Sequence, residues 1–582
     1  MSEQATPDDG IGTAPPELGG ATFPEANIRA VQAVAGALAS TLGPTPRDKL
    51  VVTALASRQP DNPNNPPRDE FAVATDGATI LEELPLEHPI APLVRRLVGP
   101  ERPGDSDVEG QDIPDGVTTS VVLAATLLDE AADLLEMGVH QADICAGYQE
   151  ALSVATDTLA AAARPLDPES NRERAEAIAR SAMNGNDIGG LVTDWARVAV
   201  DIAAQVGHPT AKTLAVRTKR TGRISDSRLV YGAVLDRNGR ADERMPRAVD
   251  DASVLVLGGH STGGLVDPEP EGDWSADSSA DFAELAAAFD GRRETVVADL
   301  VTAGVDAVLA RGGISTEYAE ALADHGVLGI RGVNRLKLTQ AARATGATVI
   351  HDPTDITTED LGWAERVAVQ NHDPRPGRRR KRKMTVIEGC KDPGSVTALL
   401  PGTFDQGGEQ LTRQLRKGAK AVAAAAGDGV SHGGYLPGAG AVDVALARAV
   451  REAAPTHSSK VQLAVERFAD AAEMVPFTVA KNAGDDPLSA VADTRARQRA
   501  EPNGGQYGYV VPDGVADAVD AGVLDAHACR RESYTAGTQV ANLILGIDQA
   551  VAATVTVERA DPEDTIYDGR AEQVQEARQN GQ

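Results

Sequence analysis

The order of hydrophobic patterns along the chain constrains its fold more than any other feature of the sequence. Apolar residues recur with helical spacing over residues 26–42 and in Ala-rich segments from about residue 119 to 206. From about residue 214 the pattern changes to short apolar runs that alternate with helical segments, and helical spacing returns after about residue 404. We therefore expect a multidomain α and α/β protein, with an α/β domain inserted into a discontinuous, mainly helical outer domain.

The composition favours packed helices and limits the classes of partner. A chain of 582 residues is too long for one core, so we expect two to four domains. Hydrophobic residues make up 42% but aromatic residues only 3%, so the interior must consist mainly of Ala, Val and Leu. The net charge of −30 predicts an acidic, solvated surface suited to a salt-rich cytoplasm. It argues against a general nucleic-acid binder, because phosphate backbones require basic surfaces.

Cysteine usage and hydropathy predict a soluble, cytoplasmic protein without a membrane partner. Cys145, Cys390 and Cys529 lie far apart and form no CxxC pair, which argues against both a disulfide framework and a zinc site. No apolar stretch is long and uncharged enough to span a bilayer, and the first residues, MSEQATPDDG, lack a basic-then-apolar signal. The polar residues 1–22 are expected to form a disordered tail.

Two short motifs place an acid and a glycine before an apolar segment. Residues 48–56 and 71–81 are expected to contain short strands, and residues 76–79 (Asp-Gly-Ala-Thr) place an acid and a tight turn at a strand-to-helix junction. Asp115 and Gly116 precede the run VTTSVVLAATLL, which has the character of a buried helix. Turns of this kind direct backbone N–H groups at phosphates, and a carboxylate beside them can hold Mg²⁺. The plainer alternative is that Asp115 and Thr118 only cap a helix.

Other candidate sites are weaker. Residues 378–383, RRRKRK, could bind an acidic partner or nucleic acid, but a solvated loop tip beside a strand is the favoured interpretation. The ten histidines show no metal-ligand spacing such as HExxH. No G-x-S-x-G elbow is present, and LPGAGAVD lacks the G-x-G-x-x-G frame of a dinucleotide site.

The motifs, taken in order, resemble those of the group II (thermosome-type) chaperonins over about residues 25–560. STLGPTPRDKLVV resembles the family's STLGPKGMDKMLV, and TDGATILEELPLEHPIA resembles NDGATILKEMDIEHPAA. EGCKDPGSVTALLPG and RFADAAEMVPFTVAKNAGDDPLSAV also have family counterparts at the same relative places. The resemblance implies a chaperonin-like subunit with a mainly helical equatorial ATP-binding domain, a hinge-like intermediate domain and an inserted α/β apical substrate-binding domain. The implied boundaries are 23–153 and 420–582 (equatorial), 154–213 and 370–419 (intermediate), and 214–369 (apical), with an acidic lid-like segment at about 265–292.

The resemblance also implies a site for ATP and Mg²⁺. Asp115 would coordinate Mg²⁺, Gly116, Thr118 and Thr119 would hold phosphate oxygens, and Gly43 and Pro44 would close over the other side of the nucleotide. The remaining residues implied to bind the nucleotide are Asp76, Gly77 and Thr79 at the first turn, and Gly438, Gly440 and Asp525 at the nucleoside end.

Five departures from the family pattern fall on this site. Lys417 stands where the family has the Asp that activates water, and Asn186 stands where it has a Lys. Val117, Pro46 and Ala439 replace a threonine and two glycines. An ammonium cannot accept a proton, so we expect impaired hydrolysis, with Lys417 holding the γ-phosphate as a point charge.

Two functions follow from the resemblance. The first is a ring-forming chaperonin subunit that binds ATP and assists unfolded or assembling client proteins, together with identical or related subunits. The alternative is a catalytically silent structural or holdase paralogue, which assembles alone or with true chaperonin subunits.

Overall fold

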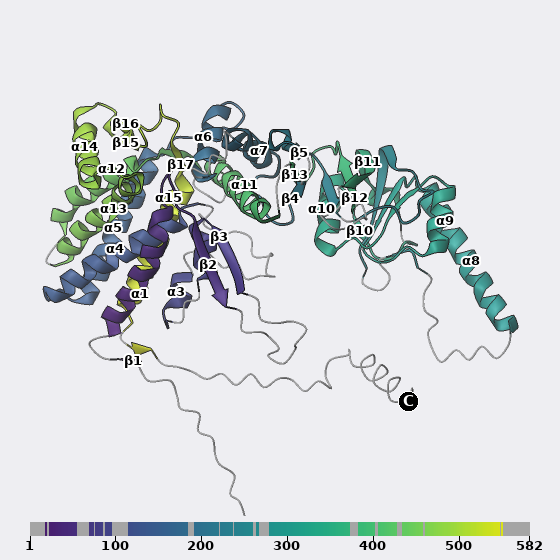
Figure 1. The fold of residues 1–582 in the computed structure, drawn as a ribbon, viewed down its shortest axis with the longest axis horizontal. Helices are drawn as coiled ribbons and strands as arrows, with labels where there is room; N and C mark the ends of the chain where they lie inside the picture. The colour runs from purple at the N-terminus through teal and green to yellow at the C-terminus, as the bar shows by residue number, and fades with distance from the viewer. Residues whose placement is uncertain are drawn as a thin grey trace, which may run out of the picture.

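The computed structural model is elongated, with a helical body at one end, an α/β body at the other, and a smaller body between them (Figure 1). The described residues are 18–19, 23–54, 69–74, 76–84, 88–95, 115–183, 191–219, 222–236, 238–259, 264–266, 279–354, 356–372, 382–401, 405–427, 433–457, 460–547 and 549–550. Each body has its own cluster of buried hydrophobic side chains. The multidomain α and α/β fold expected from the pattern order is therefore confirmed.

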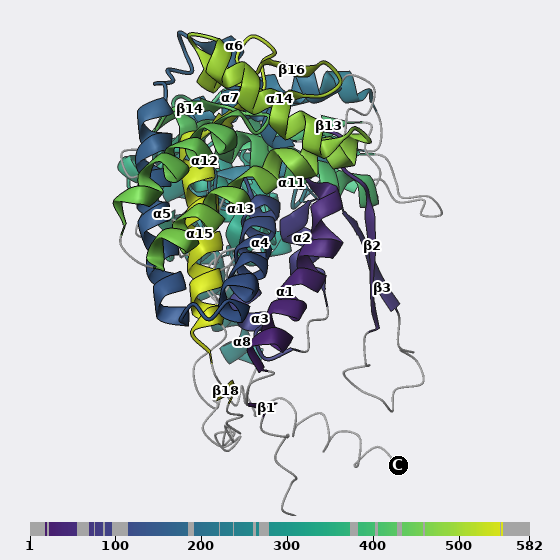
Figure 2. The same ribbon diagram turned by 90° about the vertical axis from the view of Figure 1, so that its left-hand side faces the viewer.

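The helical body is built from both ends of the chain. Helices α4, α5, α13 and α15 lie side by side in Figure 2, and each contributes buried side chains to one core. The run expected to be a buried helix forms α4, and most of its residues are buried. The helices of this body are α1 (Phe23–Leu38), α2 (Gly77–Glu83), α3 (Ala91–Arg95), α4 (Val117–Glu136), α5 (Gln141–Ala162), α12 (Ala441–Ala453), α13 (Val461–Ala483), α14 (Pro487–Ala500) and α15 (His527–Leu545), with 3₁₀ turns at Ala39–Thr41, Ala454–Thr456 and Gly504–Gln506.

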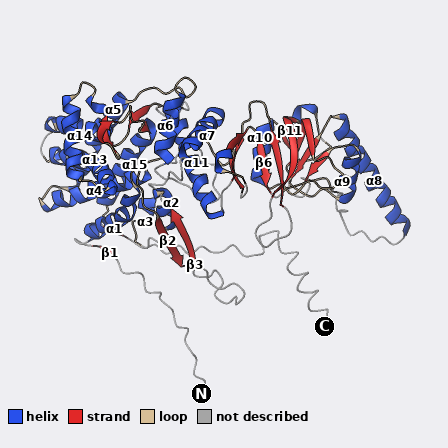
Figure 3. Cartoon of the chain, turned by 45° about the horizontal axis from the view of Figure 1, so that its top comes forward, coloured by secondary structure: helices blue, strands red, loops and turns tan. Residues whose placement is uncertain are grey.

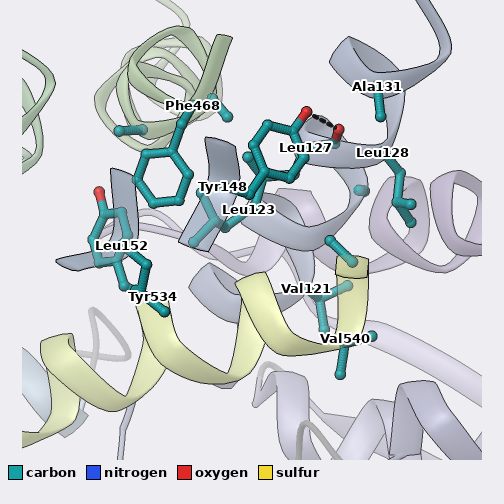
Figure 4. Close-up of a cluster of buried hydrophobic side chains, with 14 of the residues drawn as sticks. Val121, Leu123, Leu127, Leu128, Ala131, Tyr148, Leu152, Phe468, Tyr534 and Val540 are labelled. Atoms are coloured by element: carbon teal, nitrogen blue, oxygen red, sulfur yellow. Dashed lines mark hydrogen bonds between the residues drawn. The ribbon is translucent and has the colours of Figure 1, made fainter. Parts of the chain in front are cut away.

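A few aromatic side chains lie at the centre of this otherwise aliphatic core (Figure 4). The Phe468 ring lies 6.3 Å from that of Tyr148 and 6.2 Å from that of Tyr534, between centroids. The Tyr148 hydroxyl donates to the backbone carbonyl of Leu127 at 2.7 Å, so its polar end is satisfied although the residue is fully buried. Aromatic residues are few in the chain, but here they tie α4, α5, α13 and α15 together.

Short antiparallel strand pairs accompany the helices. The two predicted strands pair with each other and extend beside α2 (Figure 2). The second strand ends at Ala74, so its expected bound at residue 81 was wrong. The strand-to-helix junction expected at residues 76–79 is confirmed, because the Asp76 side chain caps a helix that begins at Gly77. These pairs are β2 (Lys49–Ala54) with β3 (Asp69–Ala74), β14 (Tyr435–Pro437) with β17 (Leu524–Ala526), β15 (Tyr507–Val510) with β16 (Gly514–Asp517), and β1 (Leu18–Gly19) with β18 (Gln549–Ala550).

The middle body packs three helices beside a small sheet. Helix α11 contacts α6 and α7, and its Leu415 and Ala419 are buried in their shared core. Strand β13 lies between β4, its parallel neighbour, and β5, its antiparallel neighbour. These elements are α6 (Arg172–Met183), α7 (Leu191–Val206), α11 (Asp405–Ala426), β4 (Leu214–Lys219), β5 (Arg228–Val230), β13 (Val396–Pro401) and a 3₁₀ turn at Ile224–Asp226.

The third body is the expected α/β insertion, and its sheet is visible at the right of Figure 3. Its strand order is β6-β12-β11-β7-β8-β9, with β10 also paired to β7. Strands β7, β8 and β9 run parallel, whereas β6, β12, β11 and β7 are antiparallel neighbours. The elements are β6 (Ala233–Asp236), β7 (Ala248–Leu257), α8 (Ser279–Thr302), β8 (Ala307–Ala310), α9 (Thr316–Asp324), β9 (Leu328–Ile330), α10 (Arg335–Thr345), β10 (Val349–Ile350), β11 (Gly362–His372), β12 (Arg382–Glu388) and a 3₁₀ turn at Thr358–Asp360.

Several predicted features lie wholly or partly outside the described residues. Among these are Asn186, residues 378–381 of the basic run, and residues 267–278 of the lid-like segment, whose residues 279–292 belong to the projecting helix α8 (Figure 1). Residues 18–19 of the predicted tail form β1. The domain boundaries stay a prediction, and α5, β11 and α11 run across three of them. Within the described residues, no helix is both long and apolar enough to cross a bilayer.

Close packing of α5 on α13 predicts that Gly147 does not tolerate a methyl group. A Cβ at this position would lie 2.5 Å from Ala464 Cβ and 2.8 Å from the Val461 carbonyl oxygen. We expect Gly147→Ala to lower the free energy of unfolding by about 1–3 kcal/mol through overpacking. Gly36→Ala in α1 is the control, because nothing lies within 4 Å of its added Cβ. This variant should raise the free energy of unfolding by about 0.5–1 kcal/mol, because alanine is favoured over glycine inside a helix. Denaturant unfolding followed by circular dichroism measures both, and equal effects would contradict the packing argument.

Candidate functional site

One cavity, of about 460 Å³, lies where the helical and middle bodies meet. It is lined by the N-terminal ends of α2, α4 and α12, one face of α11, and the start of α15. All the sequence-predicted nucleotide-binding residues except Gly438 line it, namely Gly43, Pro44, Asp76, Gly77, Thr79, Asp115, Gly116, Thr118, Thr119, Gly440 and Asp525. Gly438 lies just behind, and a Cβ there would be 3.3 Å from Asp525 Oδ1.

The N-terminus of α2 is ordered by Asp76. Its Oδ2 accepts hydrogen bonds from the Thr79 backbone N–H at 3.1 Å and from the Thr79 hydroxyl at 3.0 Å. Asp76 Oδ1 faces the other way, toward Lys417. Gly77 is required here because a Cβ would lie 2.1 Å from Thr118 Oγ1, at the start of α4. The two helix ends therefore approach more closely than any larger residue would permit.

The N-terminus of α4 shows that the capping alternative for Asp115 was wrong. Gly116 is the N-cap, with a left-handed φ of 105°, and no side chain caps the helix. A Cβ on Gly116 would also lie 2.1 Å from Ser533 Oγ, so both backbone conformation and space call for glycine. Thr118 Oγ1 lies 3.2 Å from Thr41 Oγ1, and Val117, one of the departures from the family pattern, is buried.

The turn before α12 carries another departure from the family pattern. Ala439 has a φ of 54°, in the left-handed region that glycine adopts without strain. Gly440 follows with a φ of 73° and lies against Pro476. The backbone carbonyl of Ala439 accepts from the Tyr509 N–H at 2.8 Å, which holds the turn against β15.

Lys417 joins the two carboxylates of this site. Its Nζ lies 2.9 Å from Asp115 Oδ1 and 3.5 Å from Asp76 Oδ1, and only 18% of its side chain is exposed. Burial alone would lower the pKa of Lys417, but Asp115 and Asp76 outweigh it and raise that pKa above its ordinary value. Burial opposes ionisation of Asp76, yet Lys417 and the Thr79 hydrogen bonds hold its pKa below the ordinary value. Lys417 is thus a fixed cation in the cavity.

Sequence reasoning missed that Lys417 belongs to a basic face. Arg413, Arg416, Lys417 and Lys420 all line the cavity from α11. Their spacing of i, i+3, i+4 and i+7 places them on one side of a helix, and this was the signal that could have found them. Arg180 and Arg530 line the cavity as well.

The charge of the lining is opposite in sign to that of the whole chain. Six basic side chains face four acidic ones, Asp76, Glu82, Asp115 and Asp525, which gives a formal charge of +2 among the described lining residues. The chain as a whole carries −30. A positive cavity with helix N-termini at its wall is suited to a polyanion.

Asp525, predicted at the nucleoside end, belongs to a buried charge network. Arg530 pairs with Asp525 and lies 3.6 Å from Asp443 Oδ1, which also accepts from the Tyr534 hydroxyl at 2.7 Å. Burial raises the pKa of Asp443, opposed by the Arg530 guanidinium. Arg530 thus anchors the predicted nucleoside end to α12 and α15.

Comparison with known proteins agrees with the motif order. A family model described as the TCP-1/cpn60 chaperonin family matches residues 34–555. Thermosome subunit 3 of Haloferax volcanii is 31% identical over 540 residues, covering 92% of this chain and 96% of its own. A thermosome subunit of Methanopyrus kandleri is 31% identical over 539 residues (90% and 91%), and thermosome subunit alpha of Archaeoglobus fulgidus is 30% identical over 549 residues (92% and 93%).

Removing the Lys417 charge should destabilise the protein in a pH-dependent manner. With the pKa of Lys417 raised and that of Asp76 lowered, the pair stabilises the fold between their ordinary values of 10.5 and 3.8. Its contribution is lost as pH falls through the lowered pKa of Asp76 or rises through the raised pKa of Lys417. Lys417→Met leaves two facing carboxylates, so we expect a loss of about 1–3 kcal/mol near pH 7.

The deficit of Lys417→Met should shrink as the pH falls toward 4, because burial favours the protonated form of Asp76 once Lys417 is removed, and this relieves its repulsion with Asp115. Denaturant unfolding across this pH range measures it. Arg413→Met, on the same face of α11, is the matched control, and a deficit of similar size and pH dependence in this control would contradict the specific role of Lys417.

Proposed function

This chain belongs to the TCP-1/cpn60 chaperonin family, among its group II members, and we propose that it binds ATP in the cavity between α2, α4, α11 and α12 but hydrolyses it very slowly. The observation that carries this proposal is Lys417, an ammonium paired with Asp115 and Asp76 inside the cavity. It adds positive charge for a triphosphate and removes the carboxylate base that hydrolysis needs.

Nucleotide binding is supported by the shape and charge of the cavity. The triphosphate would face the N-terminus of α4, where Gly116, Thr118 and Thr119 supply backbone N–H and hydroxyl donors, with Gly77 and Thr79 beside them. From the family resemblance, Gly43 and Pro44 would close over the nucleotide and Gly440 and Asp525 would contact the nucleoside, and all four line the cavity. Asp115 is the predicted ligand of Mg²⁺ from the family resemblance.

Slow hydrolysis is supported by the acids that remain. The carboxylates among the described lining residues are Asp76, Glu82, Asp115 and Asp525. Asp76 and Asp115 pair with Lys417, and Asp525 pairs with Arg530, so each of these three carboxylates is already engaged by a neighbouring cation. Glu82 also has an interaction partner. A nucleotide would therefore be held and positioned without an efficient proton acceptor for the attacking water.

We further propose assembly into a ring with identical or related subunits that encloses unfolded or assembling client proteins. The chain covers 91–96% of the three thermosome subunits compared, and the order of helical, middle and α/β bodies fits the equatorial, intermediate and apical roles proposed from the sequence. The acidic composition is suited to a salt-rich cytoplasm. The second candidate, a holdase that acts without turnover, is favoured by the same Lys417 geometry.

ATP turnover tests the proposed chemistry. A positioned general base contributes about 10²–10⁴-fold to a rate, so we expect steady-state hydrolysis in high KCl with Mg²⁺ to be at least about 100-fold slower than that of a thermosome subunit measured in parallel. Lys417→Asp should raise it by at least about tenfold, whereas Arg413→Asp, the same charge change one turn away, should not. Wild-type turnover equal to that of the thermosome subunit would overturn the proposal.

Electron microscopy of the purified protein in high salt tests the assembly. We expect single or double toroids, with or without added thermosome subunits. A particle that stays monomeric under both conditions would contradict a folding chamber, while leaving the nucleotide site unaffected.

A further inference from the structure

The ammonium of Lys417 stands where the family resemblance calls for a divalent cation. Asp115, the predicted Mg²⁺ ligand, has its Oδ1 2.9 Å from Lys417 Nζ, and Asp76 is held by the same group. Building on the proposed function, we infer that this site binds the metal-free form of a nucleoside triphosphate, and that Lys417 takes the place of Mg²⁺ between the carboxylates and the phosphates.

The carboxylates that could hold Mg²⁺ are already paired with Lys417. Mg²⁺ requires near-octahedral oxygen ligands at about 2.0–2.1 Å, and beside a nucleotide it usually takes them from one or two carboxylates, the phosphates and waters. Asp76 and Asp115 would have to supply the carboxylates here, and each of them contacts the Lys417 ammonium instead. Asp115 Oδ1 already makes a charge-assisted contact with Lys417 Nζ at 2.9 Å. Mg²⁺ could reach this oxygen only after Lys417 had left it.

Lys417 is poorly placed to leave. Its neighbours Leu415 and Ala419 are fully buried in the middle body, so the helix that carries it is fixed by packing on α6 and α7. Moving the ammonium away from Asp76 and Asp115 would also leave two adjacent carboxylates without their common counter-ion. The ion pair is therefore a built part of the cavity wall.

The same ammonium can also face a phosphate. A lysine ammonium has three N–H donors, and its contacts with Asp115 and Asp76 use two of them. The third can donate to a phosphate oxygen in the cavity that Lys417 lines. One side chain can thus bridge carboxylates and phosphate, which is the positional role of Mg²⁺.

The charge of the cavity leads to the same assignment. The lining carries six basic and four acidic side chains, a formal +2. With an Asp at position 417 it would carry five of each and a formal charge of zero, and a bound Mg²⁺ would then bring it to +2. Replacing that Asp by Lys changes the lining charge by the amount that one Mg²⁺ supplies. The triphosphate itself therefore meets the same formal charge, +2, in this chain without metal as it would in a cavity with Asp and a bound Mg²⁺.

Nucleotide binding with and without Mg²⁺ tests the inference directly on the wild-type protein. The probe is ATP, titrated in high KCl by isothermal calorimetry, once with excess EDTA and once with excess Mg²⁺. We expect the two dissociation constants to agree within about threefold. Binding that occurs only with Mg²⁺ would overturn this inference but leave the proposed nucleotide site standing. Absence of ATP binding under both conditions would overturn the proposed function, and this inference with it.

Two variants with the same charge change identify the residue responsible. Lys417→Asp should bind ATP at least about tenfold more weakly in EDTA than in Mg²⁺. Arg413→Asp faces the same cavity from the same helix, and among the described residues no ion pair joins Arg413 to Asp76 or Asp115. It should weaken ATP binding in both buffers and leave their ratio unchanged. Equal Mg²⁺ dependence in the two variants would overturn the role assigned to Lys417.

A measurement without nucleotide separates the cation site from binding of the ligand. Added Mg²⁺ should raise the unfolding midpoint of Lys417→Asp above the shift that it produces in the wild type, because only the variant presents three adjacent carboxylates. The unfolding midpoint of Arg413→Asp should rise with Mg²⁺ no more than that of the wild type. This comparison corrects for non-specific binding of Mg²⁺ to the acidic surface. An equal shift in the wild type and Lys417→Asp would contradict the replacement of Mg²⁺ by Lys417.

Discussion

The contact of Lys417 with Asp115 and Asp76 couples the two bodies that form the cavity. Lys417 extends from α11, which packs in the middle body, whereas the two carboxylates stand at the N-terminal ends of α4 and α2 in the helical body. This charged group therefore ties α11 to these helix ends, and it raises the formal charge of the described lining residues from +1 to +2. A substitution of Lys417 would therefore change both the placement of α11 and the charge of the cavity.

Close approach of helix ends is the second condition for the site. Gly77 leaves room for the Thr118 hydroxyl, and Gly116 leaves room for that of Ser533, so α2, α4 and α15 meet with only these small side chains between them. A helix N-terminus attracts an anion only over about its first turn, and several ends must therefore lie close together to act on one ligand. The glycines supply this proximity, and the basic face of α11 adds positive charge to the same cavity.

Local chemistry explains which parts were predictable from the sequence. The acid–glycine turns and the alternation of hydrophobic patterns are local features of the sequence. From them and from the family motifs, the sequence predicted the fold class, the buried helix α4 and the gathering of Asp76, Asp115 and Asp525 at one cavity. The strand bound at residue 81 was wrong because a short apolar run fits either a strand or a helix. The junction at Asp76 was predicted correctly, because the acid that caps α2 is visible in the local sequence. The Lys417 ion pairs join distant parts of the chain, which spacing alone does not reveal.

The raised pKa of Lys417 connects the structural role of this residue to its chemical consequence. A lysine could replace a carboxylate base only in its neutral amine form, but Asp115 and Asp76 favour the charged form and move its deprotonation further from neutral pH. The contacts that stabilise the ammonium are thus the ones that prevent it from accepting a proton. In the proposed function, phosphate affinity and the missing base would both follow from this one positive charge.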